Sequence, residues 1–174
     1  MAGILKVDKY QDFNGNDIMT SDGAGNITVN AAALKNTPAF VLTNSGNQSI
    51  STATWTQLTF DTTALDTDSA VSSSTFTVPS GKGGTYMFFW GVHGIQGLDL
   101  GEFVQLGIYV NNVRSNFSDN RMTSHTTDVE FKFCANFQAV LSAGDTVKAY
   151  VYQNEGASQN ATNAIFSGYK LIGA

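Results

Sequence analysis

The stretch "DVEFKFCANFQAVL", residues 128–141, alternates apolar and polar side chains along its whole length. Such alternation with a period of two predicts a β-strand with one buried face. One face would carry Val129, Phe131, Phe133, Ala135, Phe137, Ala139 and Leu141. The other would carry Glu130, Lys132, Cys134, Asn136 and Gln138. Cys134, the chain's single cysteine, is expected to be a buried and inert thiol.

The stretch "TYMFFWGVHG", residues 85–94, is apolar on both faces. Its first face would hold Tyr86, Phe88, Trp90 and Val92, and Met87 and Phe89 would begin the second. A strand of this kind is buried on both sides. We therefore expect a sheet of a sandwich whose outer face meets another subunit.

Five further stretches read as strands, with turn residues between them. They are residues 54–60, 74–80, 102–115, 146–153 and 164–172. Asn111-Asn112 is expected to form a tight hairpin turn, and residues 61–69 to form a loop rich in Asp and Thr. The best helix candidate, residues 28–36, is too short to be stable alone. Seven or eight short strands predict an all-β sandwich or jelly roll.

Residues 1–36 contain short apolar pairs separated by Asn14-Gly15 and by "DGAGN". They can form small hairpins but have too few apolar residues for a core of their own. We expect an extended N-terminal anchoring segment at 1–36 and a jelly-roll knob at 37–174.

The composition excludes several classes of protein. The net charge is −5, and the nine Lys and Arg residues are scattered, so nucleic-acid binding is not expected. No apolar run approaches the ~20 residues of a membrane-spanning helix, and membrane insertion is not expected. The N-terminal apolar run is too short for a signal peptide, which predicts synthesis in a cytoplasm. Charged residues make up only 13% of the chain, which suits an extracellular setting, a virion surface or a subunit contact.

No catalytic signature is present, and the chain is not expected to be an enzyme. His93 and His125 are the only histidines, and no Gly-x-Ser-x-Gly motif accompanies them. Asp99 and Glu102 have the residue types of a glycosidase pair, but a solvated loop explains them better. No catalytic residue is therefore assigned, and no cofactor is expected.

Asp61, Asp66 and Asp68 are weak candidates for calcium ligands, because calcium prefers clustered oxygen ligands. Their spacing does not match an EF-hand loop. An ordinary polar loop is the default interpretation.

Three polar segments, residues 93–103, 116–128 and 154–163, are expected to be loops. Loops on a rigid scaffold often carry binding sites. Their amide, hydroxyl and cationic groups would suit a glycan of a host surface, although plain loop solubility explains any one of them equally well. The candidate ligand-binding residues are Asn116, Arg121, His125 and Asn154.

Four motifs, in order, carry a resemblance to a known superfamily. They are "TWTQLTFDTTALDTDS" (54–69), "TFTVPSGKGGTYMFFW" (75–90), "LSAGDTVKAYV" (141–151) and "FSGYKL" (166–171). Residues 38–174 thereby resemble the complement globular-head and tumour-necrosis-factor-like jelly rolls. The resemblance implies a homotrimer whose last strand lies in an inner sheet near the subunit contact, and a calcium ion near the three-fold axis in some members. The expected core and interface residues are Tyr86, Phe88, Trp90, Phe166, Tyr169 and Leu171.

The N-terminal "ILKVD" (4–8) followed by "QDFNGN" (11–16) resembles the opening of structural proteins of tailed bacteriophages. It implies a virion protein made in a bacterial host, which docks on capsid or tail proteins through residues 1–36. The knob would decorate the capsid as a head fibre or serve as a short tail-fibre module, and it would adhere to host glycans. A free-standing lectin-like recognition module is the alternative.

Overall fold

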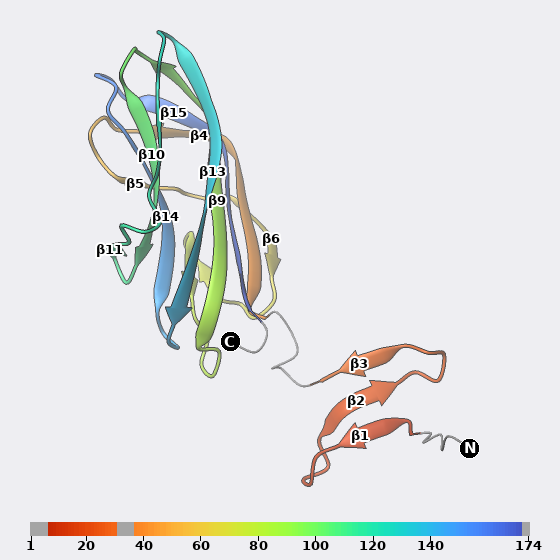
Figure 1. Cartoon of the computed structure of the whole chain (residues 1–174). Helices are drawn as coiled ribbons and strands as arrows, with labels where there is room; N and C mark the ends of the chain where they lie inside the picture. Colours follow the sequence, from red (N-terminus) through yellow and green to blue (C-terminus); the bar gives the residue numbers. More distant parts are fainter. Residues whose placement is uncertain (1–6, 31–36, 172–174) are drawn as a thin grey trace. The chain divides into compact units, whose positions relative to one another are not determined.

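The structure is a computed structural model that describes residues 7–30 and 37–171 (Figure 1). Within these ranges every regular element is a β-strand. The described residues contain no helix long and apolar enough to cross a membrane. The chain divides between residues 36 and 37 into two compact units, which are described separately below.

The smaller unit is a three-stranded antiparallel sheet. Its order is β1 (Lys9–Gln11), β2 (Asp17–Ser21) and β3 (Ile27–Val29). The two turns between these strands share the sequence D-x-x-G-N, at residues 12–16 and 22–26. The unit thus contains two copies of one turn motif, ten residues apart.

Each of these turns is closed by hydrogen bonds to the side chain of the aspartate at its first position. One carboxylate oxygen of Asp12 accepts from the backbone N–H groups two and four residues on, each at 2.9 Å. Asp22 does the same at 2.8 and 3.1 Å. The side-chain amides of Asn16 and Asn26 donate to the second oxygen of Asp12 and Asp22, and these bonds are the main cause of the lowered pKa of both carboxyl groups. Both glycines have positive φ angles, which explains why the fourth position is glycine.

The larger unit is a sandwich of two antiparallel sheets (Figure 1). The first, called the five-stranded sheet, has the order β13 (Val129–Leu141), β9 (Gly84–Leu98), β15 (Gln159–Lys170), β4 (Ala39–Ile50) and β6 (Thr62–Asp66). The second, called the seven-stranded sheet, has the order β11 (Val113–Arg114), β10 (Phe103–Val110), β14 (Thr146–Gln153), β8 (Thr75–Thr77) and β7 (Val71–Ser72). In addition, β12 (Asn120–Thr123) pairs with β10, and β5 (Thr56–Gln57) pairs with β14. The expected all-β jelly-roll sandwich is confirmed.

The core between the two sheets is rich in aromatic rings. Phe40 of β4 stacks on Phe76 of β8 with ring centroids 4.8 Å apart, and this contact joins the two sheets. Phe166 of β15 meets Phe40 edge-on at 4.9 Å, and Phe88 lies 6.1 Å from Phe166. Aromatic pairs in these geometries add to the stabilisation that burial provides. The core therefore depends on strands that are remote in sequence.

Two local predictions are confirmed by the structure. Along β13 the apolar set is buried or half-buried, apart from Val129, whose side chain lies outside the described residues, and the polar set is exposed. Asn111 and Asn112 have φ angles of 52° and 65° and connect β10 to β11. Asparagine tolerates this left-handed region better than most residues.

The structure differs from the local predictions in two ways. Strand β4, twelve residues long, was not anticipated, because most of its apolar residues are at its start and its second half, "SGNQSI", is mostly polar. Each of the four expected loops contains strand residues: β6 lies within 61–69, β12 within 116–128, the end of β9 within 93–103 and the start of β15 within 154–163. Strands β4, β6 and β12 are held by backbone pairing to neighbouring strands rather than by a pattern of their own.

Tyr86 gives the core a measurable sensitivity to alkaline pH. Its hydroxyl donates to the Lys82 carbonyl oxygen at 2.6 Å, and burial, with a smaller effect of the nearby Asp68 charge, raises its pKa to about 12. The pKa of Tyr86 in the folded protein exceeds the ordinary value of 10. The contribution of the protonated Tyr86 hydroxyl to the free energy of unfolding is therefore fully present below pH 10 and is lost as the pH rises towards 12.

We expect Tyr86→Phe to be less stable than the natural chain by about 1 kcal/mol at pH 8, the net value of the lost hydrogen bond. The difference in the free energy of unfolding between the two proteins should become smaller above pH 10. Urea unfolding at several pH values from 8 to 12 measures it, and a gap that does not change with pH would contradict the assignment.

Candidate subunit interface and surface sites

The outer face of the five-stranded sheet is the clearest candidate for a subunit interface. Six apolar side chains on four of its strands, β9, β15, β4 and β6, form a patch that we call the five-stranded face; they are Val41, Leu65, Met87, Phe89, Ile165 and Tyr169. Phe89, Ile165 and Leu65 are each about 40% exposed, at 40%, 41% and 44%. An apolar patch at the centre of a sheet marks an interaction surface more often than isolated exposed residues do.

The strand register makes this patch continuous. Ser167 lies between Phe89 on β9 and Val41 on β4, and Val41 is paired with Leu65 on β6. The Phe89 and Tyr169 rings stack with their centroids 6.4 Å apart. The patch therefore spans four neighbouring strands.

The five-stranded face is also uncharged over its central part. The outward charges of β13 are Glu130 and Lys132, which form an ion pair at 3.5 Å near one end of the strand. His93 lies on the same side, beside a shallow pocket that is also lined by Thr43 and Ile165. Depletion of charge at the centre is the compositional signal of protein interfaces.

The predicted interface residues divide between the core and this face. Tyr86, Phe88, Trp90 and Phe166 are completely buried inside the single chain, so they offer no surface to another subunit. The indole N–H of Trp90 has no hydrogen-bond partner within the described part of the protein. On β9, the apolar residues that reach the outer face are instead those of opposite parity: Phe89 is exposed and Met87 is half-buried.

The predicted interface residues near the end of the chain, Tyr169 and Leu171, are not part of the buried core. Tyr169 is half-buried on the five-stranded face, and Leu171 is half-buried, with its N–H donating to the Thr85 carbonyl oxygen at 2.9 Å. Residues 172–174 lie outside the described residues. The apolar ending therefore belongs to strand β15 and to the residue that follows it.

Cys134 is a correction to the sequence analysis. The thiol was expected to be buried, but it is exposed on the outer side of β13. The cause is its parity, because it belongs to the polar set of the alternating strand. It lies opposite Gly91, where an added Cβ would stand 3.0 Å from the Cys134 Cβ.

The three calcium candidates do not come together as a site. Asp66 accepts from two backbone N–H groups of the following turn at 2.8 and 3.0 Å. Asp68 forms an ion pair with Lys82 at 3.4 Å, and Asp61 accepts from a neighbouring threonine hydroxyl. Across residues 7–30 and 37–171, no group of three or more His, Cys, Asp or Glu side chains could hold a metal ion.

The four ligand candidates occupy different environments. Asn116 and His125 are exposed in turns. The side chain of Asn154 accepts from the Phe103 N–H at 2.6 Å, which gives it a structural role. Arg121 was expected near a loop tip, but it lies on strand β12, with its guanidinium carbon 3.5 Å from the centre of the Phe103 ring. Strand pairing between β12 and β10 thus brings Arg121 to the outer face of the seven-stranded sheet.

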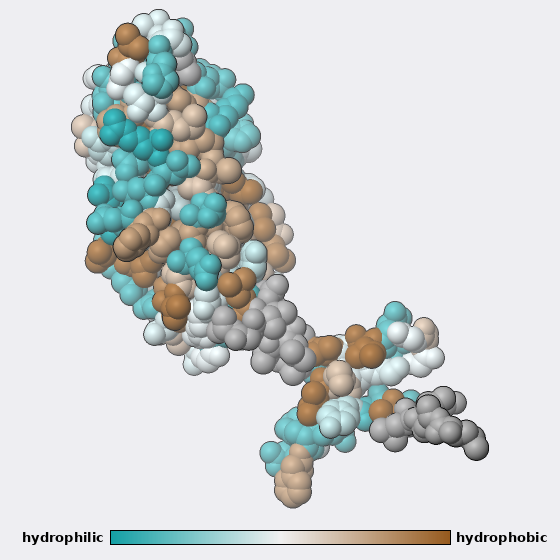
Figure 2. Space-filling model, in the orientation of Figure 1, coloured by the Kyte–Doolittle hydropathy of each residue, from teal (hydrophilic) through white to brown (hydrophobic). Residues whose placement is uncertain are grey.

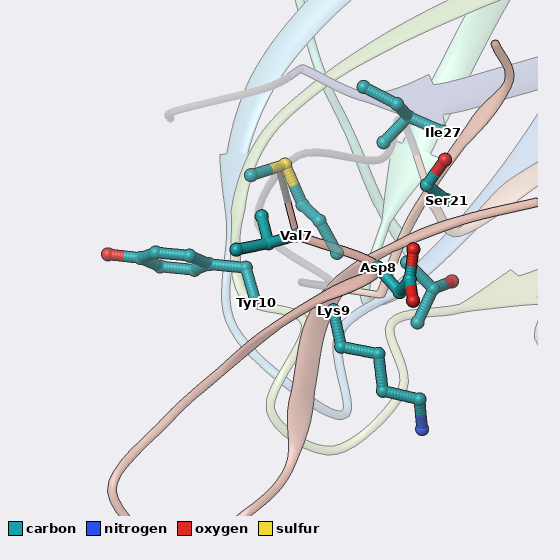
Figure 3. Close-up of a pocket in the computed structure, with 8 residues that line it drawn as sticks. Val7, Asp8, Lys9, Tyr10, Ser21 and Ile27 are labelled. Carbon is teal, nitrogen blue, oxygen red and sulfur yellow. The ribbon is translucent and has the colours of Figure 1, made fainter. Parts of the chain in front are cut away.

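The smaller unit has an exposed apolar surface of its own. Val7, Tyr10, Met19 and Ile27 line a pocket on the three-stranded sheet, and their exposed fractions range from 36% to 66% (Figure 3). Brown apolar residues are visible at the surface of this unit in Figure 2. Three short strands cannot bury such residues by themselves.

The geometry of the larger unit is that of a jelly-roll β-sandwich. No family model matches the sequence, and no curated protein is similar to it. Among solved structures, the globular domain of zebrafish complement 1qA protein matches with a TM-score of 0.55 and 17% identity, over 77% of this chain and 97% of that one.

Two other solved structures are similar to the same extent. The PRD1 vertex protein P5 matches with a TM-score of 0.56 and 17% identity, over 79% of this chain and 99% of that one. The tumour necrosis factor Eiger from S. frugiperda matches with a TM-score of 0.54 and 16% identity, over 78% and 93%. At these identities the likenesses establish the fold.

Proposed function

We propose that this chain is a virion structural protein whose jelly roll forms a homotrimeric surface knob. The observation that carries the proposal is the five-stranded face, which is apolar, uncharged at its centre and about 40% exposed at Phe89 and Ile165. Burying such a face against two further copies would remove apolar area from water, the main favourable term in protein association. The fold, shared with the complement head and Eiger, supports the trimer.

The virion setting is supported by a second set of observations. One of the similar structures is named as a vertex protein of PRD1. The unit formed by residues 1–36 exposes Val7, Tyr10, Met19 and Ile27, which suits contact with another protein. We propose that this unit docks on capsid or tail proteins, so that the knob decorates the particle as a head fibre or a short tail-fibre module. Adhesion to host surface glycans would be the work of the exposed knob.

Gold labelling of purified virions with an antibody against residues 37–174, read by electron microscopy, tests this proposal. Label over the head would indicate a capsid-decorating or head-fibre protein, and label at the tail would indicate a tail-fibre module. Absence of label from every particle would contradict the virion proposal and favour the free-standing lectin-like module. A particle lacking the gene for this chain is the control.

A further inference from the structure

The outer face of the seven-stranded sheet carries a cluster of aromatic side chains, which we call the aromatic face. Its members are Trp55, Phe103, Tyr109, Tyr150 and Tyr152, all of them half-buried. Tyr109 stacks on Tyr150 with ring centroids 3.9 Å apart, and Phe103 stacks on Tyr152 at 5.6 Å. The Trp55 ring lies 5.5 Å from Tyr152 and 6.1 Å from Tyr109 and so joins these two pairs.

Gly107 provides the space in which the Trp55 indole lies. A Cβ at Gly107 would stand 2.9 and 3.0 Å from two carbons of that ring. Gly107 belongs to β10, and Trp55 precedes β5, with β14 between them. The indole therefore reaches across a whole strand, and the glycine allows it to lie close to the sheet.

The charged residues on the strands of this face are all cationic. Strands β10, β11, β12 and β14 contain three charged side chains, Arg114, Arg121 and Lys148, although the chain carries a net charge of −5. Both arginines of the protein are among them, and each stacks on a ring of the aromatic face. Arg114 lies 5.0 Å from the centre of the Trp55 ring, and Arg121 lies 3.5 Å from the centre of the Phe103 ring.

Polar groups lie among these rings. Asp119 accepts from the Gln105 side-chain amide at 2.8 Å, and Arg114 lies 3.8 Å from the same carboxylate oxygen. The other oxygen of Asp119 is buried and has no hydrogen-bond partner within the described residues. It lies 3.3 Å from the position of a Cβ on Gly107, which places it beside the Trp55 ring. Burial raises the pKa of Asp119 against the opposing effects of Arg114 and Gln105.

We propose that the aromatic face binds an acidic saccharide chain, with pyranose rings on Trp55 and its neighbouring tyrosines and carboxylates on Arg114 and Arg121. The C–H groups of a pyranose ring are weakly positive and suit the negative face of an aromatic ring. Guanidinium groups pair with carboxylates through two parallel hydrogen bonds.

A single-stranded nucleic acid is the main competing ligand, because bases also stack on aromatic rings and phosphates also pair with arginine. The chain has 14 acidic and nine basic residues, and the three cations of this face form one small cluster rather than a groove that follows a backbone. The acidic saccharide is therefore the better match.

This inference rests on the adhesive role proposed above, but not on the trimer or the virion. The aromatic face and the five-stranded face lie on the two different sheets of the sandwich, so each can be occupied without blocking the other. A negative binding result would remove the adhesive role and leave the labelling result unaffected.

The test is calorimetric titration of the full chain with three probes of equal length: oligogalacturonate hexasaccharide, maltohexaose and hexathymidylate. We expect the acidic hexasaccharide to bind most tightly, and its affinity to fall as sodium chloride is raised. No binding of either sugar, or tighter binding of hexathymidylate, would overturn the proposal.

Variants then locate the site. Trp55→Ala and Gly107→Ala should each lower the affinity for the acidic hexasaccharide by about tenfold, and Arg121→Gln should reduce its preference over maltohexaose. Arg121→Gln changes an exposed side chain and leaves the rings in place, so it remains informative if Trp55→Ala folds poorly. Gln138→Ala, at an exposed position of β13 in the five-stranded sheet, is the control and should bind as the natural chain does. Equal loss in the Gln138 variant, or unchanged affinity in all three others, would overturn the assignment.

Discussion

Replacing Phe89 with aspartate is expected to convert the proposed trimer into monomers. Phe89 is 40% exposed at the centre of the five-stranded face, and its ring stacks on Tyr169. In a trimer this substitution would bring three carboxylates out of water without partners. At a cost of about 3 kcal/mol for each chain, the dissociation constant would rise by about two powers of ten per chain. Sedimentation equilibrium measures the change as a fall from three chain masses to one.

Val113→Asp is the matched control for this experiment. Val113 is 70% exposed and lies on β11, in the seven-stranded sheet, so an added charge there should leave the trimer intact. Circular dichroism should show the same strand content in both variants. A natural chain that sediments as a monomer would contradict the trimer, and an intact Phe89→Asp trimer would contradict the choice of face.

Replacing Gly168 with alanine is expected to destabilise the knob by about 2 kcal/mol, in the range for overpacking a core. Gly168 is buried on β15 between Phe88 of β9 and Phe40 of β4. An added Cβ would stand 2.6 Å from a ring carbon of Phe88 and 2.9 Å from one of Phe40. Neither ring can move away easily, because both are completely or almost completely buried and Phe40 is stacked on Phe76. Urea unfolding of the variant and the natural chain measures the difference.

Gly156→Ala controls for the general effect of removing a glycine. A Cβ at Gly156 meets nothing within 4 Å, so this variant should be neutral or slightly more stable through its smaller unfolded-state entropy. Equal stabilities of the Gly168 and Gly156 variants would show that the clash is relieved in another way.

Much of the fold could be predicted because some of its signals are local. The alternation of residues 128–141 depends only on neighbouring residues, and the structure has the same alternation. The Asn111-Asn112 turn is equally local, because it follows from the backbone freedom of asparagine. The order of the four motifs between residues 54 and 171 indicated the jelly-roll class, and the structural likenesses agree with that class.

The candidate sites were harder to predict because side-chain parity and strand pairing decide them. Residues 85–94 are apolar on both faces, so the sequence alone could not tell which parity faces the core. The structure buries Tyr86, Phe88 and Trp90 and exposes Phe89. The second apolar face of this stretch, which begins with Met87 and Phe89, nevertheless indicated that the outer side of the strand would meet another surface.

By itself, the sequence determined the alternating strands, the Asx-closed turns of residues 12–16 and 22–26, and the low surface charge. These properties depend on residues a few positions apart. Only the tertiary structure decided that Trp55 lies against Gly107, beside Arg114 and near Tyr109. The reason is that β5, β14 and β10 become neighbours through hydrogen bonds between segments far apart in the chain. No periodicity within one segment records that pairing.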